Sequence, residues 1–128
     1  MAENTSENTH VLYDDEVHGS VKIADDVIAV IAALAATDIK GVASMAGNIT
    51  NDLIAMLGYK KLSKGVRIAV NDGEVRVALN INILYGYSIP DVCAKVKEKV
   101  TAQIQNMTGL TVTEVKINIA DVDNSQNI

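Results

Sequence analysis

The sequence predicts an α+β fold of two layers, in which two long helices pack on one mixed, mainly antiparallel sheet. One observation is a hairpin pattern, in which apolar residues alternate with polar ones on both sides of Asn71-Asp72-Gly73. The other is helical spacing of apolar residues in two stretches, one after Asp25 and one after Ser88. With 128 residues and 48% hydrophobic residues, the chain has the size and composition of one globular domain.

The N-terminal part predicts a tail followed by a strand. Residues 1–12 are polar and offer little apolar surface to bury, so we expect a flexible tail before a single domain over residues 13–122, with a second flexible tail at 123–128. Apolar residues then alternate with polar ones from Val17 to Ile23, which predicts a strand with one buried face.

A first helix is predicted from Asp25 and Asp26, whose side chains suit a helix N-terminus as caps and as negative charges. Lys40-Gly41 supplies the stop signal. The helix between them is apolar on nearly all sides, so we expect either that two layers cover it or that part of it contacts another molecule.

The middle of the chain predicts a short strand from Val42 to Met45 and a small helix within 46–65 that Thr50 or Asn51 caps. The hairpin follows, with strand residues on both sides of its turn. Its alternating apolar residues are Val66, Ile68, Val70, Val75, Val77, Leu79, Ile81 and Ile83.

A second helix is predicted to open at Ser88 and Pro90, since serine caps helices and proline is tolerated in the first turn. Gly109 closes it. One apolar stripe marks its buried face, and a last strand follows with alternating apolar residues. The stripe is Val92, Val96, Val100, Ile104 and Met107, and the strand residues are Val115, Ile117 and Ile119.

If these apolar strand residues face the helices, the opposite face of the sheet is polar. It presents Arg67, Arg76, Asn80, Asn82, Glu114, Lys116 and Asn118. Asparagine is a poor strand former, so this face is either a solvated surface or a hydrogen-bonding surface for another molecule. Tyr85 and Tyr87 flank Gly86, and we expect either local packing or one buried anchor and one exposed ring. The candidate face for a partner or for self-assembly is therefore Arg76, Asn80, Asn82, Asn118, Lys116, Tyr85 and Tyr87.

A dense basic cluster consists of Lys60, Lys61, Lys64 and Arg67. It is either a solvated loop or a contact for anionic lipid, nucleic acid or an acidic partner. The net charge of −5 argues against a protein held mainly by phosphate contacts, and the predicted sheet face lacks stacking aromatics, so nucleic acid is not the expected partner. Binding of RNA or another nucleic acid through this cluster is the alternative function.

No catalytic, cofactor-binding or metal-binding residues are predicted. His10 and His18 lack ligand spacing, and the glycines match neither a phosphate-binding loop nor a dinucleotide fingerprint. The acidic residues near 14–16 and 25–26 lack calcium-loop spacing. Cys93, the one cysteine, lies beside the apolar stripe and is expected to be a small core residue. We therefore expect a protein that is not an enzyme and needs no cofactor.

Several short motifs together resemble the alkaline shock protein family, the general and envelope stress proteins of Gram-positive bacteria. They are I-A-D at the first helix, G-V-A-S-M-A-G after it, K-G-V at the hairpin, Y-G-Y-S-I-P before the second helix, and N-M-T-G-L followed by V-T-E-V-K-I. Their order and spacing extend over residues 20–122, nearly the whole expected domain.

The resemblance implies a non-enzymatic stress-response scaffold or interaction protein that supports envelope homeostasis. Such proteins are abundant and cytoplasmic, form oligomers, and lie beside the membrane through a small membrane-anchored protein partner. For this chain we accordingly expect a homo-oligomer without direct membrane insertion. A cytoplasmic location also agrees with the single cysteine and with an N-terminus that shows no secretory signal.

Overall fold

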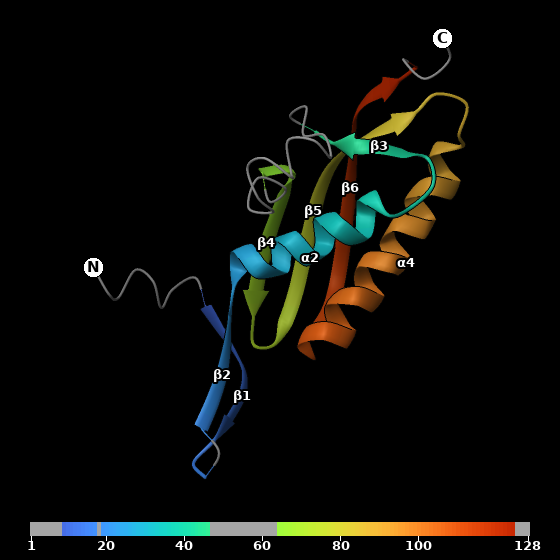
Figure 1. The fold of residues 1–128 in the computed structure, drawn as a ribbon. Helices are drawn as coiled ribbons and strands as arrows, with labels where there is room; N and C mark the ends of the chain where they lie inside the picture. The colour runs from blue at the N-terminus through green and yellow to red at the C-terminus, as the bar shows by residue number, and fades with distance from the viewer. Residues whose placement is uncertain (1–8, 18, 47–63, 125–128) are drawn as a thin grey trace.

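The computed structural model describes residues 9–17, 19–46 and 64–124 (Figure 1). Over these residues the chain forms two helices and six strands, and the strands lie in two sheets. The prediction of two long helices on one sheet is therefore wrong. The first strands pair with each other instead of joining the main sheet, and the first helix has only 13 residues, about 20 Å in length.

The first sheet is a hairpin of β1 (Thr9–Asp15) and β2 (Gly19–Ala24), paired antiparallel. It projects from one end of the molecule (Figure 1). The sequence did not predict β1, and its first residues belong to the segment expected to be a tail. That segment is polar, and a register shift between Val11 and Tyr13 breaks the alternation that would mark a strand.

Helix α2 (Asp25–Thr37) follows β2 directly. Its N-cap is Ala24 and no side chain caps it, so the expected capping by aspartate is wrong. The carboxylate of Asp25 pairs instead with Nε2 of His10 in β1. Most of the helix is buried, in agreement with its apolar sequence, although Val27 and Leu34 are exposed.

The second sheet has β5 (Glu74–Leu84) at its centre. On one side, β3 (Val42–Met45) and β4 (Val66–Asn71) pair antiparallel with opposite ends of β5, and on the other side β6 (Thr111–Asp123) pairs with it in parallel. The hairpin is confirmed: Asn71 pairs with Glu74 across Asp72 and Gly73, whose φ angles are 52° and 78°. Positive φ at both central residues is the geometry of a type I′ turn.

Helix α4 (Ile89–Thr108) begins and ends as the sequence predicts. Oγ of Ser88 accepts a hydrogen bond from the Asp91 N–H at 3.5 Å, and Gly109 is the C-cap with φ 78°. The predicted stripe is wrong at its last member, because Met107 is 63% exposed and Thr108 is buried in its place. The Thr108 hydroxyl donates to the Ile104 carbonyl at 2.6 Å and accepts from the Leu110 N–H at 3.1 Å, which ties it into the helix end.

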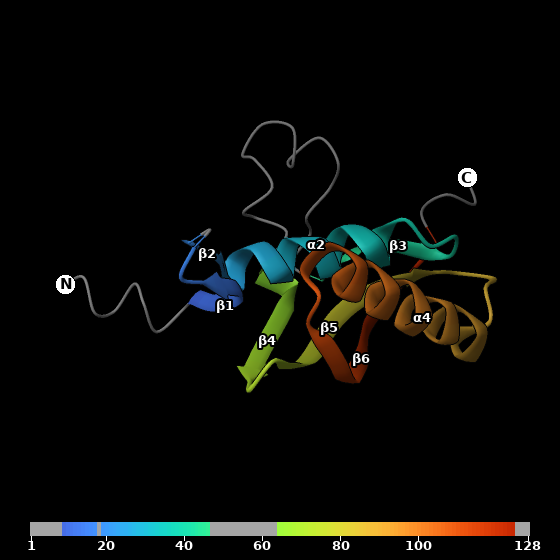
Figure 2. The ribbon, with the colours of Figure 1, turned by 90° about the horizontal axis from the view of Figure 1, so that it is seen from below.

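Both helices lie on the same side of the second sheet (Figure 2). The core between them is aliphatic, as the lack of Phe and Trp requires. One face of β5 and one stripe of α4 contribute Val75, Val77, Leu79, Ile81, Ile83, Val92, Val96, Val100 and Ile104, and α2 and β3 add Ile28, Ala32, Ala33, Ala36 and Met45. No described helix or strand covers the opposite face of the sheet.

Two predictions lie outside the described residues, namely the small helix after Thr50 or Asn51 and the two tails beyond residues 9–124. Within the described part of the chain, neither helix combines the length and the apolar character that crossing a membrane requires.

Candidate interaction face

The face of the second sheet that points away from α2 and α4 is called the open face below. The register decides its members, because side chains alternate between the two faces of a strand and paired residues share a face. The members used below are Ser44, Arg67, Ala69, Arg76, Ala78, Asn80, Asn82, Glu114, Lys116, Asn118 and Asp121, and the same register also places Asn71, Glu74, Leu84, Thr111 and Asp123 on this face. All seven residues predicted for the polar face thus lie together on it.

Asp121 and Ser44 lie on the open face although alternation along their strands predicts the helix side for both. Asp121 follows Ile119 by two positions, so simple alternation would place both on the helix side. A register shift between Ile119 and Asp121 makes Ala120 an extra residue, and Asp121 consequently pairs with Asn82 on the open face. Ser44 reaches this face through a similar shift in β3, after Val42.

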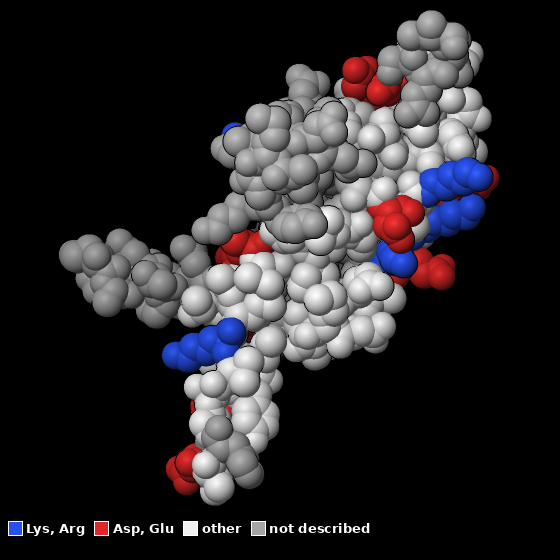
Figure 3. Space-filling model, in the orientation of Figure 1, with Lys and Arg blue, Asp and Glu red and all other residues white. Residues whose placement is uncertain are grey.

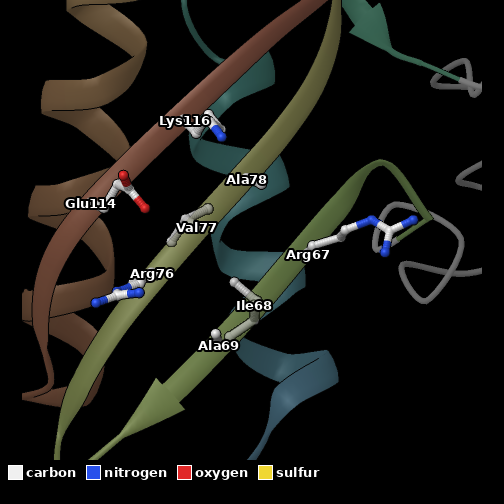
Figure 4. A pocket seen from close by; sticks show the side chains of 8 residues that line it. All are labelled: Arg67, Ile68, Ala69, Arg76, Val77, Ala78, Glu114 and Lys116. Atoms are coloured by element: carbon white, nitrogen blue, oxygen red, sulfur yellow. The ribbon is translucent and has the colours of Figure 1, made fainter.

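A hollow of about 240 Å³ lies on the open face over β4, β5 and β6 (Figure 4). Arg67 and Lys116 both pair with Ala78, while Arg76 lies between Ala69 and Glu114. Small side chains therefore form the floor, and charged ones surround it. Glu114 and Lys116 extend from β6 toward β5, while the side chain of Arg67 extends away from β5 (Figure 4).

The charge around this hollow is mainly positive, although the whole chain carries −5. Arg67, Arg76 and Lys116 are exposed, and Glu114 is the acidic residue among the lining side chains. Between described residues no ion pair involves these three cations. The hollow can consequently attract a negatively charged group without breaking a described ion pair.

Next to the hollow lies a part of the open face that is rich in amide groups. Asn80 pairs with Asn118, and Asn82 lies between Ser44 and Asp121. The Asn82 amide donates a hydrogen bond to Oγ of Ser44 at 3.0 Å. Asn80 and Asn82 are half-buried and Asn118 is exposed, so these amides can donate to and accept from a molecule that covers the face.

Tyr85 and Tyr87 lie beyond the end of β5, at the entrance to α4. The Tyr85 ring is 64% exposed. A Cβ atom added at Gly41 would lie 2.9 Å from Cδ2 of Tyr87, which shows that the Tyr87 ring packs closely over this glycine. A mainly apolar hollow of about 420 Å³ lies here, and its lining residues are Ile83, Leu84, Tyr85, Gly86, Tyr87, Ile89 and Val122.

The structure describes only half of the predicted basic cluster. Lys60 and Lys61 lie outside the described residues, whereas Lys64 is exposed just before β4 and Arg67 belongs to the open face. Arg67 therefore connects the two predicted features, the basic cluster and the polar face. The register places it in the same row as Lys116, which is 49 positions later in the sequence.

The histidines and the cysteine, which are the side chains most suited to catalysis or metal binding, do not lie together in the described part of the chain. His10 pairs with Asp25, Cys93 is half-buried on α4, and His18 lies outside the described residues. In the part of the chain that the structure describes, no group of three or more His, Cys, Asp and Glu residues is placed to hold a metal ion.

The fold and the open face define a class of small α+β protein with helices on one side of a sheet and a polar surface on the other. Comparison with known proteins identifies the family within this class. The model of the alkaline shock protein 23 family, described by a "cell envelope-related function", matches residues 13–124, and the chain belongs to this family. The predicted resemblance to the alkaline shock proteins is thereby confirmed.

Individual relatives agree with this assignment. Uncharacterized protein YqhY of Bacillus subtilis is 34% identical over 110 residues, which cover 86% of this chain and 82% of YqhY. Uncharacterized protein YloU of the same organism is 30% identical over 82% of this chain and 89% of its own length. A Streptococcus pyogenes protein named "Stress response regulator gls24 homolog" is 26% identical over 95% of this chain and 69% of its own length.

Proposed function

We propose that this chain is a non-enzymatic stress-response scaffold that supports the cell envelope by self-assembly and by docking to a small membrane-anchored protein. The open face is the contact surface, and its exposed polar character is the observation that carries the proposal. The family has a cell envelope-related function, and relatives are named as stress response regulators, which supports the role. A cytoplasmic location beside the membrane, through that partner, completes the proposal.

The amide part of the open face supports recognition. Asn80 and Asn82 are in the central strand of the sheet, where asparagine is unfavourable compared with β-branched residues. Both are half-buried, so their amide groups are partly removed from water, and each hydrogen bond they form is worth more than at a fully solvated position. A second molecule that offers donors and acceptors at this surface gives these amides hydrogen bonds in addition to the one from Asn82 to Ser44, which favours association.

The apolar hollow at Tyr85 extends the candidate surface. Exposed aromatic rings contribute large contact areas in protein interfaces. Leu84 is on the same face of β5 as Asn82 and Asn80, and it also lines the apolar hollow. The amide-rich part of the open face and the apolar hollow are therefore adjacent. We assign the apolar region to the membrane-anchored partner, whose bound segment would be apolar in character.

Light scattering after gel filtration tests the self-assembly. The wild-type chain is expected to elute with a mass above 13.6 kDa, increasing with concentration. Replacing both Asn80→Lys and Asn82→Lys should lower that mass while circular dichroism stays unchanged. The matched control is Asn106→Lys, at an exposed position of α4. An unchanged mass for the double variant contradicts the assignment of the contact to the open face.

A pull-down from detergent-solubilised cells tests the second half of the proposal. The tagged wild-type chain should retain a small membrane protein that the Tyr85→Asp variant does not retain. Retention that is equal for both chains would show that the apolar hollow is not the docking site.

Binding of RNA is the second candidate, because Arg67, Arg76 and Lys116 lie on one face next to the predicted basic cluster. This function predicts that the chain retains RNA at low salt, that retention falls steeply with added salt, and that Lys60→Glu combined with Lys61→Glu weakens it. Failure to retain RNA at low salt rules it out.

A further inference from the structure

The hairpin of β1 and β2 is called the arm below. Its half nearest to the body is fixed by contacts with the rest of the chain. His10 pairs with Asp25 at the start of α2, and Leu12 and Ile23 pack against the core. The arm forms a sheet of its own, and no strand of the second sheet pairs with it among the described residues.

The outer half of the arm is exposed. Tyr13 and Val21 pair across the two strands, and they are 44% and 52% exposed. Val17, in the turn between the strands, is 83% exposed. A two-stranded hairpin is by itself marginally stable in water, and clustered exposed apolar residues typically mark a contact with another molecule. The outer half is therefore suited to a surface that covers it.

The end of the arm is acidic. Asp14 and Glu16 are exposed, and Figure 3 shows acidic side chains at the end of the arm that is farthest from the body. The surface that covers this end must consequently tolerate negative charge. The hollow of the open face fits this requirement, because three cations, Arg67, Arg76 and Lys116, line it with one acidic residue, Glu114, over a floor of small side chains.

The geometry points to a contact between two copies of this chain: we propose that the arm of one copy docks on the open face of another, with its acidic end at the hollow. The arm cannot contact the open face of its own copy, because β2 continues directly into α2, and α2 lies on the opposite side of the sheet (Figure 2). The inference rests on the self-assembly proposed above and adds which two surfaces meet.

Two different surfaces meet in this contact, so charge reversal can test it by complementation. The arm variant combines Asp14→Lys and Glu16→Lys, and the face variant combines Arg67→Glu and Arg76→Glu. Each variant alone should associate at least about tenfold more weakly than the wild type, because like charges then face each other. An equimolar mixture of the two should regain assembly, since each reversed surface meets its complement.

Light scattering of the full chain at low salt measures the association, and circular dichroism checks the fold. The control variant combines Lys95→Glu and Lys97→Glu on α4, which changes the net charge as the face variant does, at exposed positions away from both surfaces. It should associate like the wild type. Added salt should weaken wild-type assembly, because exposed charges are screened.

The outcomes separate this inference from the proposed function. If the wild type assembles and the arm variant assembles equally well, the arm contact is wrong and self-assembly stands. If the arm variant and the face variant are each weakened but their mixture is not restored, the two surfaces do not meet. If the wild type is a monomer at every concentration up to hundreds of micromolar, the arm contact and the proposed self-assembly are both wrong, while docking to the membrane-anchored protein is decided by the pull-down.

Discussion

Gly41→Ala should destabilise the protein through two separate effects, both of which follow from the structure. Gly41 has a φ of 103°, and a side chain in such a backbone conformation costs about 1–3 kcal/mol. The added Cβ would also lie 2.7 Å from Cγ2 of Val92 and 2.9 Å from Cδ2 of Tyr87. Overpacking of this kind costs about 1–3 kcal/mol more. The expected loss in the free energy of unfolding is therefore about 2–6 kcal/mol.

Gly86→Ala is the matched control, because it has the backbone effect without the steric one. Its φ is 97°, and an added Cβ has no atom within 4 Å. We expect a loss of about 1–3 kcal/mol for this variant. Urea unfolding followed by circular dichroism measures both losses through the shift in midpoint. If Gly41→Ala and Gly86→Ala lose the same free energy, Tyr87 does not pack over Gly41 as described.

Other predictions concern the core, the arm and the start of α4. Ile81→Ala should lower the free energy of unfolding by about 2–5 kcal/mol because Ile81 is fully buried, whereas exposed Met107→Ala should change it by less than about 0.5 kcal/mol; urea unfolding compares them. Asp25→Asn removes the carboxylate that pairs with His10, so hydrogen exchange should accelerate in the arm but not in β5; equal exchange rates in the arms of the variant and the wild type would contradict anchoring by this contact. Ser88→Ala should remove a helix cap worth about 0.5–1 kcal/mol, at the low end of the usual range because the hydrogen bond is long. The melting temperature should fall accordingly, and an unchanged melting temperature would contradict the cap.

Local elements of the second sheet and α4 could be predicted because their signals are local. Asn71-Asp72-Gly73 supplies residues that tolerate positive φ, and Asp72 and Gly73 adopt it. Ser88 and Gly109 stand at the ends of α4 for similarly local reasons. The alternation along β5 then divides the sheet into a helix side and an open face.

The pairing of distant strands could not be predicted in the same way. The expected single sheet is wrong because β2 pairs with β1, a segment whose polar composition and register shift hide its strand pattern. Pairing depends on which edge is available in three dimensions, and the sequence carries no local signal for that. The same limit applies to Asp121, because the register shift at Ala120 reverses the face that alternation assigns to it.

The sequence predicts the members of the candidate face that follow from alternation, but it does not predict features that depend on packing in three dimensions. Arg76, Asn80, Asn82, Lys116 and Asn118 alternate with apolar residues that are buried in β5 and half-buried in β6, so their common face follows from period two. The exposure of the outer arm was hidden, because it depends on how far the hairpin extends beyond the body.

Site-specific photo-crosslinking of the purified full chain tests most directly whether the open face binds another copy. A photoreactive residue is placed at Asn118, which is exposed on β6, and for comparison at Asn106, which is exposed on α4. We expect a covalent product containing two copies from position 118 and little or none from position 106. Equal yields from both positions, or no product at 118 at concentrations where light scattering detects assembly, would contradict it.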